Sequence, residues 1–129
     1  MRVASPARHD EKGSVNAELK AVDGSANPYL ALGGLIAAGL DGIARELDPG
    51  DPVLVDPGTL TDAERERRGI KRLPTSLEEA LRALESDTVL ADAVGPLLLA
   101  AFSAVKRGEI AGFAAQDEAF ELRMHARSF

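Results

Sequence analysis

Residues Glu18–Leu47, ELKAVDGSANPYLALGGLIAAGLDGIAREL, decide the fold that we expect for this chain. Apolar and polar residues alternate over Val15–Val22, which predicts a half-buried strand. Asn27 is a favoured N-cap and Pro28 a favoured first helical residue, so a helix is expected to begin directly after a tight turn. The stretch therefore predicts a strand, a turn and a long helix over Pro28–Leu47.

The long helix combines an apolar stripe with several glycines. Apolar residues recur at spacings of three and four, which is typical of one buried face. Each glycine costs about 1 kcal/mol relative to alanine in an exposed helix interior. So many glycines predict that another backbone passes very close, and tight helix packing explains them without a ligand. The stripe is Leu32, Leu35, Ile36, Leu40, Ile43 and Leu47, and the glycines are Gly33, Gly34, Gly39 and Gly42.

The flanking residues predict a loop before this stretch and short helices after it. Met1–Ser14 is polar, mixed in charge and interrupted by proline and glycine, which is typical of a loop. Since no second strand is evident, the predicted strand needs a partner from another chain or from a sheet outside these residues. Five further helices are expected: Thr61–Arg68 capped by Thr61 with Glu64, Thr75–Leu84 capped by Thr75 with Glu78, Thr88–Val94 capped by Asp87, Pro96–Lys106, and about Asp117–Ala126.

The composition favours a mainly α fold in a single domain, with one N-terminal strand followed by five to six helices. The 129 residues are 45% hydrophobic but only 4% aromatic, so the core is expected to be aliphatic. The absence of cysteine excludes disulfides, thiolate metal sites and cysteine nucleophiles. A net charge of −6 argues against a nucleic-acid partner. The longest apolar stretch, Tyr29–Leu40, is too short to span a bilayer, and we expect a soluble, cytoplasmic protein without a membrane partner.

The charged residues Glu18 and Lys20 form the candidate site. They are two apart on one strand face, where a carboxylate and an ammonium could hold a metal ion and an anion side by side. They could equally form a solvated strand face, and the spacing alone favours that alternative. His9 and His125 lack metal-ligand spacing with any other donor, and Glu109 is interpreted as an ordinary helix-surface carboxylate.

The run from Glu18 to Ile43 resembles the signature segment near the C-terminal end of glutamine synthetases. The resemblance extends over nearly the whole chain, because later pieces fit the closing helices of that family. The matching residues are Glu18, Asp23, Ser25-Ala26-Asn27-Pro28-Tyr29-Leu30, Ala38-Gly39-Leu40-Asp41-Gly42-Ile43, Leu73-Pro74, Ser76-Leu77, Ala80-Leu81, Asp87, Gly95, Lys106 and Glu109.

The resemblance implies roles for three residues. Glutamine synthetases condense glutamate with ammonia, driven by ATP through a γ-glutamyl phosphate. In the family pattern, Glu18 is a ligand of a divalent metal, Mg²⁺ or Mn²⁺. Lys20 stands where the common pattern has an arginine that contacts the transferred phosphoryl group, and lysine lacks the bidentate fork of arginine. Arg2 matches an arginine that contacts ATP phosphates.

The Glu18-Leu19-Lys20 form resembles the branch of nodulin/glutamine-synthetase fusion proteins and γ-glutamyl ligases that act on other amines. The family's enzymes are several hundred residues long, with an N-terminal β-grasp domain and a strand barrel. We therefore expect residues 1–129 to be a C-terminal segment of the catalytic domain, inactive alone. Its expected partners are glutamate, ammonia or an amine, the missing N-terminal part, and further copies in a homo-oligomer. The alternative is a non-catalytic helical interaction module or an inactive remnant.

Overall fold

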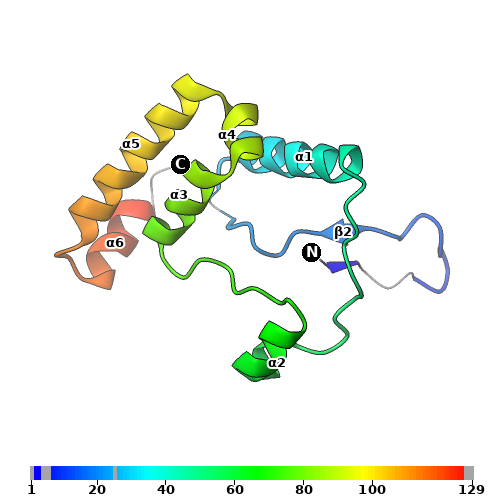
Figure 1. Ribbon diagram of the computed structural model, residues 1–129. Helices are drawn as coiled ribbons and strands as arrows, with labels where there is room; N and C mark the ends of the chain where they lie inside the picture. The colour runs from blue at the N-terminus through cyan, green and yellow to red at the C-terminus, as the bar shows by residue number, and fades with distance from the viewer. Residues whose placement is uncertain (1, 4–6, 25, 127–129) are drawn as a thin grey trace.

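The computed structural model describes residues 2–3, 7–24 and 26–126, and the order of elements is that of a strand pair followed by helices. Figure 1 shows α1, α3, α4, α5 and α6 gathered together, with α2 apart on a long connection. The predicted mainly α fold, with a strand before five to six helices, is confirmed. The elements are β1 (Arg2–Val3), β2 (Ala17–Glu18), α1 (Pro28–Ala44), a 3-10 turn at Pro57–Thr59, α2 (Asp62–Arg67), α3 (Leu77–Ser86), α4 (Thr88–Val94), α5 (Pro96–Phe113) and α6 (Glu118–His125).

The strand pair corrects two expectations. β2 pairs antiparallel with β1, and Arg2 stands opposite Glu18. The N-terminal residues are thus not all loop, and β2 has a partner within this chain. β2 is also far shorter than the predicted strand over Val15–Val22, since the described pairing covers only Ala17 and Glu18. The alternation of apolar residues alone could not show how much backbone was available for pairing.

α1 begins and ends through local hydrogen bonds. The Asn27 side chain accepts hydrogen bonds from the backbone N–H groups of Tyr29 (3.0 Å) and Leu30 (3.2 Å), so the predicted N-cap is confirmed. At the other end, the Leu47 N–H donates to the Gly42 carbonyl at 2.9 Å and the Glu46 N–H to the Ile43 carbonyl at 3.1 Å. This is a Schellman motif. Its left-handed residue is Glu46, with φ 51°, rather than the usual glycine.

α1 packs on α4 through a face of small residues, and its leucine-rich stripe points away. Leu32, Ile36 and Ile43 are 57%, 53% and 76% exposed. A Cβ atom added at any of the four α1 glycines would meet nothing within 4 Å. The close backbone expected at these glycines is therefore not found among the described residues. The half-buried positions of α1 are Leu30, Ala31, Gly34, Ala37, Asp41 and Gly42.

α3, α4 and α5 pack against one another around two tight corners. Asp87 ends α3 and also caps α4, where its side chain accepts from the Leu90 N–H at 3.0 Å. Gly95, with φ 82°, joins α4 to α5, and this left-handed conformation suits glycine. Among the described residues, Leu81 on α3 and Ser103 on α5 are the most buried, 5% and 4% exposed.

A salt bridge joins α3 to α5, and capping residues set where α2 and α3 begin. Arg107 Nη2 on α5 lies 2.7 Å and 2.8 Å from the carboxylate oxygens of Glu85 on α3. The predicted capping box of α2, with Thr61 and Glu64, is confirmed. α3 is instead capped by Ser76, whose Oγ accepts from the Glu79 N–H at 3.2 Å. The expected Thr75 and Glu78 pair is therefore wrong by one residue.

α5 continues to Phe113, well beyond the predicted end at Lys106, because glycine weakens a helix without breaking its backbone hydrogen bonding as proline does. Within the residues that the structure describes, no single helix is long and apolar enough to cross a membrane. α4 and α5 meet the length and composition requirement only together, and they are bent by 104° where they join.

Candidate functional site

The two residues of the candidate site lie in contact. Glu18 is the last residue of β2, and Lys20 follows it in the turn that leads toward α1. Lys20 Nζ lies 2.9 Å from Glu18 Oε2, with the lysine side chain 65% and the glutamate side chain 37% exposed. Lys20 is not part of the strand as predicted, but its side chain still lies beside that of Glu18. Because both side chains are more than a third exposed, solvent screens their attraction, and the pair contributes about 0–1 kcal/mol.

Arg2 is placed beside this pair by the strand register. Its backbone stands directly opposite that of Glu18 in the antiparallel pair. The Arg2 side chain lies outside what the structure describes. The backbones of Arg2, Glu18 and Lys20, the three residues singled out from the sequence, therefore lie close together. Of their side-chain contacts, the structure describes the one between Glu18 and Lys20.

The donor set around Glu18 does not by itself fit a divalent metal site. Mg²⁺ and Mn²⁺ prefer about six oxygen ligands. Across the described ranges, no group of three or more aspartate, glutamate or histidine side chains comes together to hold a metal ion. Glu18 therefore offers one carboxylate, and the described residues do not supply a complete set of ligands.

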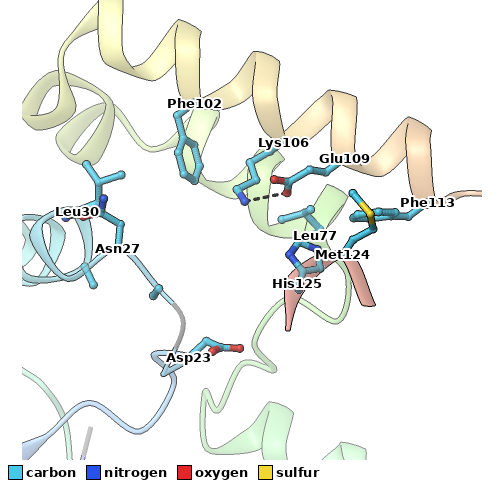
Figure 2. A pocket seen from close by; sticks show the side chains of 12 residues that line it. Asp23, Asn27, Leu30, Leu77, Phe102, Lys106, Glu109, Phe113, Met124 and His125 are labelled. Carbon is cyan, nitrogen blue, oxygen red and sulfur yellow. Dashed lines mark hydrogen bonds and ion pairs between the residues drawn. The ribbon is translucent and has the colours of Figure 1, made fainter. Parts of the chain in front are cut away.

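A cavity of about 820 Å³ lies between the turn before α1 and the helices α5 and α6 (Figure 2). Asp23 and Asn27 line it on one side, and His125 on α6 lines the other. The rings of Phe113 and His125 pack edge to face with centroids 5.2 Å apart, which joins α6 to α5. His125 is exposed.

The wall of this cavity carries an ion pair that sequence reasoning missed. Lys106 Nζ lies 2.8 Å from Glu109 Oε2, and the two side chains are 28% and 25% exposed. The same ammonium is 5.7 Å from the centre of the Phe102 ring. Glu109 is thus not an ordinary surface carboxylate. The signal was the spacing of three residues, which places Lys106 and Glu109 on one helix face.

Comparison with known proteins gives the family of this chain. The family model for the glutamine synthetase catalytic domain matches residues 1–125. The chain therefore belongs to the glutamine synthetase family, and its mainly helical fold resembles the C-terminal part of that catalytic domain.

Three characterised relatives are similar to this chain. A gamma-glutamylpolyamine synthetase of Streptomyces coelicolor is 46% identical over 96 residues, which are 74% of this chain and 21% of the relative. A glutamine synthetase of Halobacterium salinarum is 41% identical over 116 residues, 90% of this chain and 26% of the relative. A glutamate–methylamine ligase of Methyloversatilis universalis is 47% identical over 81 residues, 63% of this chain and 18% of the relative. The chain thus spans about a quarter or less of the length of these relatives.

Proposed function

We propose that this chain is part of an ATP-dependent ligase that joins glutamate to ammonia or another amine through a γ-glutamyl phosphate. The observation that carries the proposal is the contact between Glu18 and Lys20, 2.9 Å apart, directly before the turn that begins α1. The contact occurs in a chain that belongs to the glutamine synthetase family. Residues 1–129 serve as a C-terminal segment of the catalytic domain. The β-grasp domain and most of the barrel are contributed from outside these residues.

Glu18 contributes one carboxylate oxygen to the site of a divalent cation, Mg²⁺ or Mn²⁺. The cation supplies charge that neutralises phosphate oxygens. The position of Glu18 at the end of β2, beside the Lys20 ammonium at 2.9 Å, supports this role. The other ligands come from the part of the domain outside this chain.

Lys20 stabilises the phosphoryl group while it is transferred. In the first step, a γ-carboxylate oxygen of glutamate attacks the γ-phosphorus of ATP, and ADP leaves. The amine nitrogen then attacks the γ-carbonyl carbon, phosphate leaves, and the nitrogen loses a proton. The 65% exposure of the Lys20 side chain supports a role in the first step, since its ammonium is accessible to a phosphoryl group. It acts as a point charge rather than as a bidentate fork. Arg2 contacts the phosphates of ATP.

The amine is ammonia or a larger amine. The names of the relatives support both, since they include glutamine synthetases, a gamma-glutamylpolyamine synthetase and a glutamate–methylamine ligase. The complete enzyme is a homo-oligomer that works in the cytoplasm, where we place its function in nitrogen metabolism.

The test joins this chain to the part of the domain that it needs. The region of the Halobacterium salinarum glutamine synthetase that this chain matches is replaced by the chain itself, which gives what we call the joined protein. ATP-dependent formation of γ-glutamyl amides is then measured with ammonia, methylamine and a polyamine. We expect activity in the joined protein, none in the isolated chain, and a large loss in the joined protein with Glu18→Ala.

Two outcomes contradict the proposal. Full activity of the Glu18→Ala variant favours the alternative, in which the chain is a helical interaction module or an inactive remnant. Activity of the isolated 129-residue chain shows that it needs no further part of the domain.

A further inference from the structure

The cavity between the turn before α1 and the helices α5 and α6 takes no part in the proposed reaction. Glu18 and Lys20 are not among the described residues that line it. Its volume of about 820 Å³ lies within the range of about 300–1,000 Å³ that is typical of small-molecule sites. Its walls come from the turn before α1, from α3, from α5 and from α6, so a ligand there would join segments that are distant in the sequence. We call it the α5–α6 cavity.

Much of the wall of this cavity is apolar and partly aromatic. The Phe113 ring on α5 and the His125 ring on α6 pack edge to face, so the two helices present one continuous surface. Such a surface favours contact with methylene groups, and the face of an aromatic ring also attracts ammonium groups. The apolar side chains that line the cavity are Leu30, Leu77, Phe102, Phe113 and Met124.

Carboxylates lie on two sides of the α5–α6 cavity. Figure 2 shows Asp23 across the cavity from Lys106 and Glu109, with the Leu77 and Met124 side chains between them in this view. Among the described residues that line the cavity, carboxylates therefore outnumber ammonium groups by two to one at neutral pH. A cleft with an excess of negative charge concentrates cations and repels anions.

The wall at Glu109 already holds an ammonium group. Lys106 Nζ lies 2.8 Å from Glu109 Oε2 and 5.7 Å from the centre of the Phe102 ring. A carboxylate and an aromatic face thus stabilise one ammonium group together. The contact with Lys106 is made by Oε2, so Oε1 can accept a hydrogen bond from a second ammonium group. The Glu109 side chain is only 25% exposed, which weakens the screening of such a contact by solvent.

We infer that the α5–α6 cavity is a binding site for an alkyl diammonium ion, a chain of methylene groups with an ammonium group at each end. One ammonium group pairs with Asp23 and the other with Glu109 Oε1. The methylene chain lies on the apolar wall between the two carboxylates. Both ends of such a molecule are charged at neutral pH, because alkylamines titrate near the pKa of lysine, about 10.4. The inference does not rest on the proposed function, since neither Asp23 nor Glu109 is assigned to the reaction.

Other classes of ligand fit the α5–α6 cavity less well. An amino acid or a nucleotide would bring its own negative charge close to Asp23 and Glu109. A monoamine would pair with one of these carboxylates and leave the other without a partner from the ligand. A divalent metal ion needs several oxygen ligands in one place, and no such group of side chains comes together within the part of the chain that the structure describes.

Isothermal titration calorimetry of the 129-residue chain with putrescine, a four-carbon diamine, tests the site. Butylamine has the same carbon chain with one ammonium group, and Mg²⁺ has two charges without the carbon chain. An ionic strength of about 0.15 M screens attraction to scattered surface charges. We expect putrescine to bind at least about fivefold more tightly than either control ligand. Comparable affinities for all three ligands, or no binding of putrescine, would overturn the inference.

Substitutions of the two carboxylates locate the bound diamine. We expect Asp23→Ser and Glu109→Gln each to weaken the binding of putrescine by about fivefold to tenfold. Serine is a common turn residue, so it suits the segment before α1. Glu121→Gln removes the same charge from an exposed position on α6 that does not line the cavity, and it leaves the affinity unchanged. Equal affinities of all three variants would overturn the inference, because the diamine would then bind elsewhere on the acidic chain.

Lys106→Met gives a measurement of opposite sign. Without the lysine, Glu109 interacts with the ligand alone, and methionine retains an unbranched apolar side chain. We expect putrescine to bind severalfold more tightly to this variant, whereas a purely structural role of Lys106 predicts no gain. Melting temperatures measured without ligand show that the variants are folded. Weaker binding to folded Lys106→Met would overturn the inference, and the comparison of ligands on the unsubstituted chain requires no variant to fold.

Discussion

Replacement of Lys20 by methionine separates a functional charge from a structural one. Lys20 and Glu18 are 2.9 Å apart, but their side chains are 65% and 37% exposed. At such exposure, solvent screens the attraction, and holding two long side chains in place loses entropy, so the pair contributes about 0–1 kcal/mol. We therefore expect Lys20→Met to lower the free energy of unfolding of the isolated chain by less than about 1 kcal/mol.

The same substitution has a large effect on the reaction. Removal of one charged group that stabilises a transition state lowers kcat by about 10²–10³. We expect a loss of this size for the joined protein, measured as γ-glutamyl amide formed at saturating ATP and glutamate. Urea denaturation of Lys20→Met, Glu18→Gln and the double variant gives the coupling free energy of the pair. A coupling above about 2 kcal/mol, together with unchanged kcat, would refute the reasoning, because the pair would then be structural.

Three further predictions concern stability. Glu46→Gly removes the strain of a left-handed backbone at the end of α1 and should raise the free energy of unfolding in urea by about 0.5 kcal/mol. Gly69→Ala, at φ 66° after α2, introduces such strain and should lower the free energy of unfolding. Equal effects of the two substitutions would contradict this. Leu81→Ala should lower the free energy of unfolding by about 2–4 kcal/mol, and a loss below about 1 kcal/mol would show that α3 and α5 do not share a core. The Thr61 hydroxyl and N–H groups hold the pKa of Glu64 below its usual 4.5, so their contribution to stability is present above pH 4.5 and lost as the pH falls through the lower folded pKa. Thermal melts of Thr61→Val should show a weaker dependence on pH in that range, and an unchanged dependence would contradict it.

Features determined by adjacent residues could be predicted from the sequence. The Asn27 cap of α1, the Thr61–Glu64 capping box and the Asp87 cap follow from side chains that reach backbone groups two or three residues away. The cap of α3 was displaced by one residue because Thr75 and Ser76 are both capable caps. Ser76 takes the N-cap position, and Thr75 donates its N–H to Glu79 Oε2 at 2.8 Å.

Features that depend on distant residues could not be predicted. β1 is two residues long and has no periodicity, so its pairing with β2 left no signal in the sequence. The apolar stripe of α1 was identified correctly, but periodicity does not say which element covers a face. α4 packs on the opposite, small-residue face. The spacing of Glu18 and Lys20 predicted one strand face, whereas the structure has Lys20 in the turn after β2. The chemistry expected of the two residues came from the resemblance to a family.

The most direct test of the central claim is the Mg²⁺ dependence of γ-glutamyl amide formation by the joined protein with Glu18→Gln. Glutamine keeps the size of the side chain and removes the charge that a divalent cation prefers. We predict activity at least about 100-fold lower at low Mg²⁺, partly restored at high Mg²⁺. Glu11→Gln, an exposed change in the loop before β2, serves as the control and leaves the Mg²⁺ dependence unchanged. Identical activity and Mg²⁺ dependence for Glu18→Gln and the unsubstituted joined protein would contradict the assignment of Glu18 to the cation site.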